Sequence, residues 1–108
     1  MSVLMVKQLK TVYSVEDVQV THTQLDVGQE IPWHKHTSVT DTFYAICGPV
    51  IVELDFDRKI MLSTGESAQV PAGQAHRVFN PGETMVEFLL IQGVGVYDFL
   101  DVRSSRTP

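Results

Sequence analysis

Three histidines and one aspartate of this chain have the types and spacing that could hold a metal ion. His34 and His36 stand one residue apart, and Asp41 follows within a segment otherwise typical of a buried strand. Side chains in a strand alternate between its two faces, so His34 and His36 are expected to point to the same side. Ile31 and Lys35 are then expected on the opposite side.

Turns are needed to bring the other two residues to the same place. Asp41 lies five positions after His36, an odd separation that would reverse its face in an unbroken strand. If residues 37–40 form a connection, the next strand can return Asp41 toward the imidazoles. His76 follows a Pro-x-Gly turn far along the chain and supplies a third imidazole. Imidazoles suit Fe, Ni, Cu and Zn, and a carboxylate adds a preference for Mn and Fe.

The elements that position these residues are predicted to be β-strands. Short runs rich in Val, Ile, Thr, Phe and Tyr alternate with Gly, Pro, Asp and Asn, as in a sandwich or barrel, and helical periodicity is absent. The 108 residues indicate a single domain, 1–108, with its barrel core at about 18–100. Residues 1–16 are expected to form an edge or exchanged strand, and 102–108 a frayed tail. The predicted strands are 18–26, 30–35, 42–46, 50–55, 59–62, 67–70, 76–80 and 85–92.

Composition limits the kinds of partner and the cellular compartment that are expected for this chain. The net charge is −5 and the 8 basic residues are scattered, which argues against binding nucleic acid or acidic lipid. No apolar run is long enough to cross a membrane, and Met1–Lys10 lacks the apolar core of a secretory leader. A cytoplasmic protein that binds a small molecule is therefore expected.

One stretch of the chain resembles the first motif of the cupins, which are small double-stranded β-helix barrels of the jelly-roll type. Gly28, His34, His36, Asp41 and Gly48 stand at the spacing of that motif, with Asp in place of the usual Glu. Because Asp is one methylene shorter than Glu, two roles stay open for Asp41. It is either a direct metal ligand or an outer residue that orients a histidine.

A second stretch resembles the other cupin motif. Gly65, Pro71, Gly73, His76 and Asn80 match it at every position. With both motifs present, the chain is identified as a member of the cupin superfamily, of the small single-domain kind. The resemblance implies one divalent metal ion inside the barrel, Fe, Mn, Ni or Zn, with Cu as a further option. The ligands that it implies are His34, His36, Asp41 and His76.

The resemblance leaves the reaction open. Mixed histidine and carboxylate ligation favours a metalloenzyme of the dioxygenase or oxidoreductase kind. The alternatives are a metal-dependent isomerase, epimerase or lyase acting on a sugar or keto acid, and a non-catalytic small-molecule or metal-binding module. Further candidates are His22 and Gln24, which either line the cavity or face solvent, and Tyr97, which could close over a barrel end. Short barrels of this family usually pair, so a homodimer is expected.

Overall fold

The computed structural model describes residues 7–15, 18–55, 57–93 and 100–101, and for 7–15 and 101 it describes the backbone alone. Over these residues the chain forms ten β-strands and no helix. No helix able to cross a membrane is found there. The strands are β1 Lys7–Val15, β2 Val18–Leu25, β3 Glu30–Lys35, β4 Thr40–Cys47, β5 Val50–Leu54, β6 Arg58–Leu62, β7 Ser67–Val70, β8 His76–Phe79, β9 Val86–Gly93 and β10 Leu100–Asp101.

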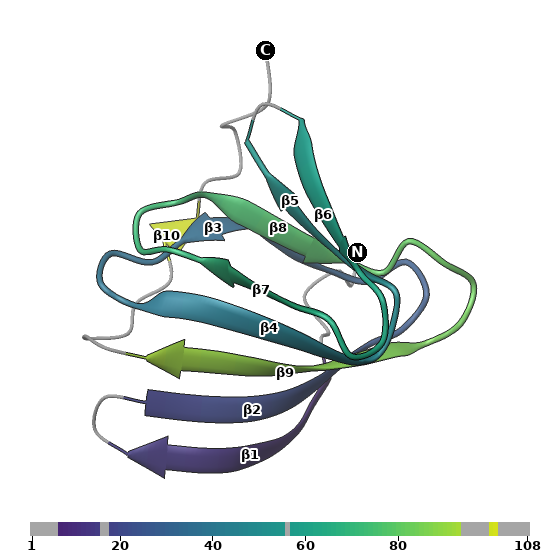
Figure 1. Ribbon diagram of the computed structural model, residues 1–108, viewed down its shortest axis with the longest axis horizontal. Coiled ribbons are helices and arrows are strands. Elements are labelled where there is room, and N and C mark those ends of the chain that lie inside the picture. The colour runs from purple at the N-terminus through teal and green to yellow at the C-terminus, as the bar shows by residue number, and fades with distance from the viewer. Residues whose placement is uncertain (1–6, 16–17, 56, 94–99, 102–108) are drawn as a thin grey trace.

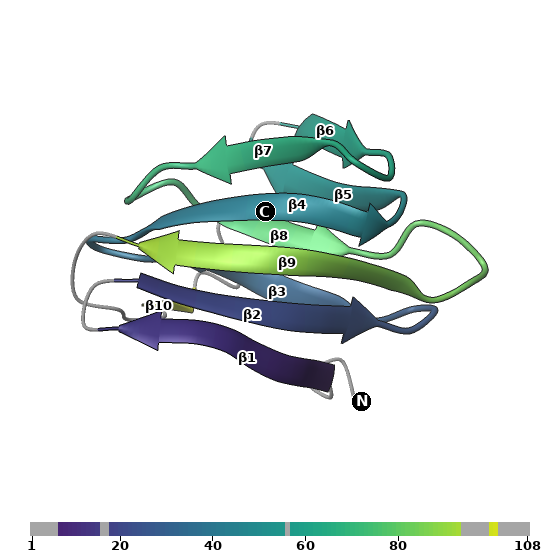
Figure 2. The ribbon, with the colours of Figure 1, turned by 60° about the horizontal axis from the view of Figure 1, so that its bottom comes forward.

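The strands form two five-stranded sheets. Their orders are β1-β2-β9-β4-β7 and β10-β3-β8-β5-β6, and neighbouring strands run antiparallel. Figures 1 and 2 show the two sheets facing each other, with β1 at the outer edge of its sheet. The all-β class predicted from the sequence is confirmed.

Each of the eight strands predicted between residues 18 and 92 is present, with its ends within two residues of the expected ones. The largest difference concerns β4, which begins at Thr40, so that Asp41 belongs to this strand as its second residue. The connection that returns Asp41 toward the histidines is therefore shorter than expected and covers 37–39. The two-residue strand β10 has no counterpart among the predicted strands, because so short a run carries no periodicity.

The space between the sheets is filled by side chains that alternate along the strands. Phe43 on β4 and Phe88 on β9 meet with their ring centroids 5.7 Å apart, and each is almost completely buried. This apolar cluster supplies the burial that holds the two sheets together. Its buried members are Leu25, Phe43, Ala45, Val50, Val52, Leu62, Val70, Val78, Val86 and Phe88.

β3 contains a bulge that changes which of its side chains face inward. Ile31 pairs with Val78 of β8 and His34 pairs with His76, so three steps along β3 match two along β8. The extra residue falls next to Pro32, which has no backbone N–H to donate to the hydrogen bonds between β3 and β8. As a result Ile31 packs against the core, and His34 is buried as well. The expectation that Ile31 faces away from the histidines is wrong for this reason.

Asn80 joins the connection between β8 and β9 to the end of β2. Its Nδ2 donates to the carbonyls of Leu25 at 3.1 Å and Thr84 at 2.8 Å, and its Oδ1 accepts from the N–H of Gly82 at 2.9 Å. Buried polar groups require such partners, so each contact stabilises the connection between β8 and β9. The Asn80 of the second motif therefore has a structural role.

Gly48 occupies a position where a side chain has no room. A Cβ there would lie 2.7 Å from the carbonyl oxygen of Leu62. We expect Gly48→Ala to lower the free energy of unfolding by about 1–3 kcal/mol, because the backbone must shift to admit the methyl group. Urea denaturation measures this change.

Gly82→Ala is the matched control for that measurement. A Cβ at Gly82 would meet no neighbour closer than the Oδ1 of Asn80, at 3.8 Å. Its stability should be unchanged or slightly higher, since alanine restricts the unfolded chain. Equal stabilities of the two variants would contradict the prediction.

Candidate metal site

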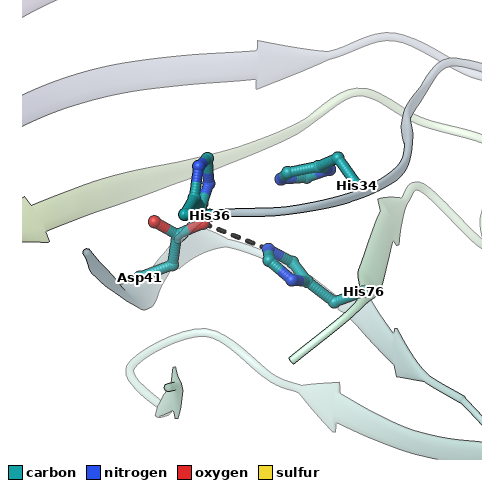
Figure 3. Close-up of side chains that lie close together, drawn as sticks. All are labelled: His34, His36, Asp41 and His76. Carbon is teal, nitrogen blue, oxygen red and sulfur yellow. Dashed lines mark hydrogen bonds and ion pairs between the residues drawn. The ribbon is translucent and has the colours of Figure 1, made fainter. Parts of the chain in front are cut away.

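Four polar side chains from both sheets meet in the interior (Figure 3). His34 on β3 pairs with His76, the first residue of β8, and His36 directly follows β3. Asp41 comes from β4 in the opposite sheet. All four are at most 3% exposed, and one ligand atom from each lies within 4.8 Å of the others. We call these four residues the histidine–aspartate cluster; the sequence predicted the same four.

The carboxylate of Asp41 contacts two of the imidazoles through a single oxygen. Its Oδ2 lies 3.0 Å from Nε2 of His36 and 3.1 Å from Nε2 of His76. Two donor atoms bound at right angles to one ion, at typical bond lengths, lie about 2.8–3.1 Å apart. Asp41 therefore stands at the distance of a ligand although it is shorter than Glu. The geometry therefore allows the direct role.

Backbone carbonyls fix the orientation of two imidazole rings. The Nδ1 of His34 donates to the carbonyl of Pro32 at 2.7 Å, and the Nδ1 of His76 donates to the carbonyl of Gln74 at 2.9 Å. Because a carbonyl oxygen can only accept, Nδ1 carries the proton in both rings. Nε2 is left as the nitrogen with the lone pair, the arrangement found in metal-binding histidines.

His76 shows why the cluster suits a cation. Its Nδ1 donates to Gln74, while its Nε2 faces the Oδ2 of Asp41. A neutral imidazole has one proton, so the second contact would set a lone pair against a carboxylate oxygen. A metal ion, or a second proton, removes this repulsion. Three imidazoles and one carboxylate also form a donor set that fits a divalent transition-metal ion.

The environment keeps two residues of the cluster in the forms that metal binding requires. Burial, together with the nearby His76, lowers the pKa of His34 to about 4. Burial opposes the charged form of Asp41, but the adjacent imidazoles of His36 and His76 outweigh it and hold the pKa of Asp41 well below its usual range. At neutral pH His34 is therefore neutral and Asp41 is ionised. Metal binding requires these two forms.

The turn of the second motif is attached to the first motif. The N–H of Gly73 donates to the carbonyl of His36 at 2.8 Å, and the N–H of Gln74 donates to that of Pro71 at 3.2 Å. Gly73 has a φ of +85°, a left-handed conformation that favours glycine. The loop that precedes His76 is thus fixed against the segment that carries His36.

One residue of the site is missing from the sequence prediction. Gln92 on β9 pairs with Asp41 on β4, and its Nε2 donates to the Oδ1 of Asp41 at 3.1 Å. The signal that could have found Gln92 is the pairing of β4 with β9. That pairing joins residues 51 positions apart, and the pattern of neither strand specifies its partner.

The weaker candidates lie away from the cluster or outside the described residues. His22 and Gln24 alternate with three buried residues of β2, so they point to the outer face of the sheet. The Nε2 of His22 lies 2.9 Å from the Oε1 of Glu87. Gln24 donates to the Oδ1 of Asp26 at 2.8 Å. The structure thus brings neither side chain to the cluster, and Tyr97 lies outside the described residues.

Comparison with known proteins identifies the family. Residues 21–92 match the family model of the cupin domain. Because this match covers more than half of the chain, the chain belongs to the cupin family. Its two facing sheets are the double-stranded β-helix predicted from the two motifs.

One curated relative is much longer than this chain. The mannose-1-phosphate guanylyltransferase of Sinorhizobium fredii (strain NBRC 101917 / NGR234) is 30% identical over 87 residues. The match covers 81% of this chain and 17% of the relative, so the chain spans less than a fifth of that protein. The similarity therefore concerns one part of the relative.

Solved structures share the same barrel. A protein with a double-stranded β-helix domain from Klebsiella pneumoniae subsp. pneumoniae MGH 78578 has a TM-score of 0.76 and 26% identity, over 87% of this chain and 81% of that one. KdgF from a Halomonas species has a TM-score of 0.74 and 21% identity, over 84% and 82% of the two chains. The second likeness shows the fold alone.

The low pKa of His34 predicts that the metal-free protein loses stability in acid. The ordinary pKa of histidine is 6.5, and that of buried His34 is about 4. Between these values the unfolded chain binds a proton at this position that the folded chain does not. The free energy of unfolding should therefore decrease as the pH falls through this window, by at most about 3 kcal/mol for this residue.

Chemical denaturation of chelator-treated protein across that pH window measures the effect. His34→Gln should flatten the pH dependence, because glutamine does not titrate. Gln69→Met is the control, since Gln69 is an exposed residue of β7 that does not titrate, and it should keep the slope of the unmodified chain. The same slope for His34→Gln and the unmodified chain would argue against the prediction.

Proposed function

We propose that this chain is a metal-dependent enzyme of the dioxygenase or oxidoreductase kind that acts on a small organic molecule. The observation that carries the proposal is the histidine–aspartate cluster, buried between the sheets and compact enough for one ion. Its mixed donors suit Fe and Mn, with Ni, Zn and Cu as further candidates. Four protein donors leave positions open on a six-coordinate ion, and these positions would take substrate and dioxygen.

A second candidate is a metal-dependent isomerase, epimerase or lyase that acts on a sugar or keto acid. The similarity to a mannose-1-phosphate guanylyltransferase, whose name specifies a sugar phosphate, favours a sugar ligand. Such a reaction needs an acid or base beside the ion. His22 was the histidine available for that role, but it faces outward and contacts Glu87. We therefore place this candidate second.

The assembly and the compartment belong to the same proposal. We propose a homodimer, because β1 lies at the outer edge of its sheet and an edge strand offers backbone groups to a second chain. The net charge of −5 supports a small molecule as the ligand in preference to nucleic acid. The cytoplasm remains the location that we propose from the sequence.

Elemental analysis of protein purified without chelators should find a divalent transition metal, about one ion per chain. His34→Ala and Asp41→Ala each remove a donor from the cluster. Each should weaken metal binding by more than the roughly 10–100-fold that loss of an outer hydrogen bond causes. His22→Ala is the control and should keep its metal. A metal-free unmodified protein would refute the site, and unchanged affinity of Asp41→Ala would refute the carboxylate as a ligand.

Oxygen dependence separates the candidate reactions. Protein loaded with Fe or Mn should convert a substrate from a panel of small organic acids and sugars and consume dioxygen as it does so. Turnover should stop under anaerobic conditions and in His34→Ala. Turnover that continues without dioxygen would favour the isomerase, epimerase or lyase. Metal binding with no turnover of any substrate would favour a non-catalytic module.

A further inference from the structure

Gln92 lies next to the histidine–aspartate cluster but belongs to neither sequence motif. It stands directly opposite Asp41 in the antiparallel pair of β4 and β9. Phe88, four residues earlier on β9, is buried in the core, so strand alternation turns Gln92 to the same interior side. Its Nε2 donates to the Oδ1 of Asp41 at 3.1 Å. The amide is thus held against the one carboxylate of the cluster.

The two oxygens of Asp41 have different neighbours. Oδ2 lies 3.0 and 3.1 Å from the Nε2 atoms of His36 and His76, whereas Oδ1 receives the amide proton of Gln92. These contacts on opposite sides fix the rotation of the carboxylate plane. Without the amide, the carboxylate could turn until both oxygens faced the imidazoles, since rotation about a terminal carboxylate bond has only broad minima.

This rotation matters more for aspartate than for glutamate. A short side chain reaches the cluster in fewer conformations, so the placement of Oδ2 depends on whatever restrains the carboxylate. Residues that hydrogen-bond a metal ligand without touching the metal orient that ligand and change how tightly the ion is held. Gln92 supplies that restraint from a neighbouring strand, across 51 positions of sequence.

We propose that Gln92 is a positioning residue that makes Asp41 bind metal through Oδ2 alone. The inference rests on the proposed metal function and deepens it. A carboxylate that binds through both oxygens would fill one more coordination position than one that binds through a single oxygen. By retaining Oδ1, Gln92 keeps that position available to the substrate. The amide therefore controls how many ligands the ion can accept from outside the protein.

The test uses Co²⁺ titrations of the chelator-stripped full chain. Gln92→Met keeps the length of the side chain and removes the amide donor. It should weaken Co²⁺ binding by about 10–100-fold, because the unrestrained carboxylate must then be ordered when the ion binds, whichever of its oxygens it uses. Gln69→Met is the matched control, because Gln69 is an exposed residue of β7 in the same sheet and pairs with Thr42. It should bind Co²⁺ as the unmodified chain does. Equal affinity of Gln92→Met and the unmodified chain would overturn the proposal.

Two further measurements separate positioning from a general structural effect. In an Asp41→Ala background, Gln92→Met should no longer change Co²⁺ affinity, because the amide acts through that carboxylate; a persisting loss would overturn the proposal. The visible absorption of bound Co²⁺ reports its coordination number. It should differ between Gln92→Met and the unmodified chain, and identical spectra would overturn the single-oxygen role.

Failure of this proposal is distinguishable from failure of the proposed function. If the unmodified chain binds no Co²⁺, the metal site itself is refuted; if it binds Co²⁺ and Gln92→Met binds equally well, only the role of Gln92 is refuted. Circular dichroism shows whether Gln92→Met folds. If it does not fold, Gln92→Asn replaces it, because its amide is one methylene too short to reach Asp41. It is expected to weaken Co²⁺ binding in the same direction, and unchanged affinity would overturn the proposal.

Discussion

The carboxylate of Asp41 is ionised and buried, and the arrangement of the site around it follows from the need to give that charge partners. Two imidazole nitrogens contact its Oδ2, and the amide of Gln92 donates to its Oδ1. A buried charge without partners is strongly destabilising, so the donation from Gln92, and a proton or a cation between Oδ2 and the imidazoles, are needed by the fold as well as by the chemistry. The partners come from β8, β9 and the segment after β3. Correct pairing of these strands is therefore a condition for burying Asp41 at all.

The apolar core supports the site directly. Phe43 lies two residues after Asp41 on the same face of β4, and its ring contacts His76 with the centroids 6.0 Å apart. Phe43 also packs against Phe88, so one aromatic side chain joins the core to the imidazoles. This contact limits the movement of the His76 ring, whose Nδ1 is already held by a backbone carbonyl. The histidine–aspartate cluster is thus restrained by packing as well as by hydrogen bonds.

The parts of this structure that depend on local sequence could be predicted from it. The strands follow from alternating side chains and turn residues, and the shared face of His34 and His36 follows from their spacing. Parts that depend on pairing could not be predicted. Gln92 enters the site only because β9 lies beside β4. Ile31 enters the core only because β3 is bulged opposite β8, and a bulge is a property of two strands together.

Because the cluster spans both sheets, a bound ion would affect how long the protein stays folded. Asp41 lies on one sheet and His76 on the other, 35 residues away. An ion held by both would act as a reversible cross-link that closes a long loop and binds the folded chain alone. Mass action then makes the folded population depend on the concentration of free metal. The supply of metal in the cell would set how long each molecule resists proteolysis, independently of any reaction it performs.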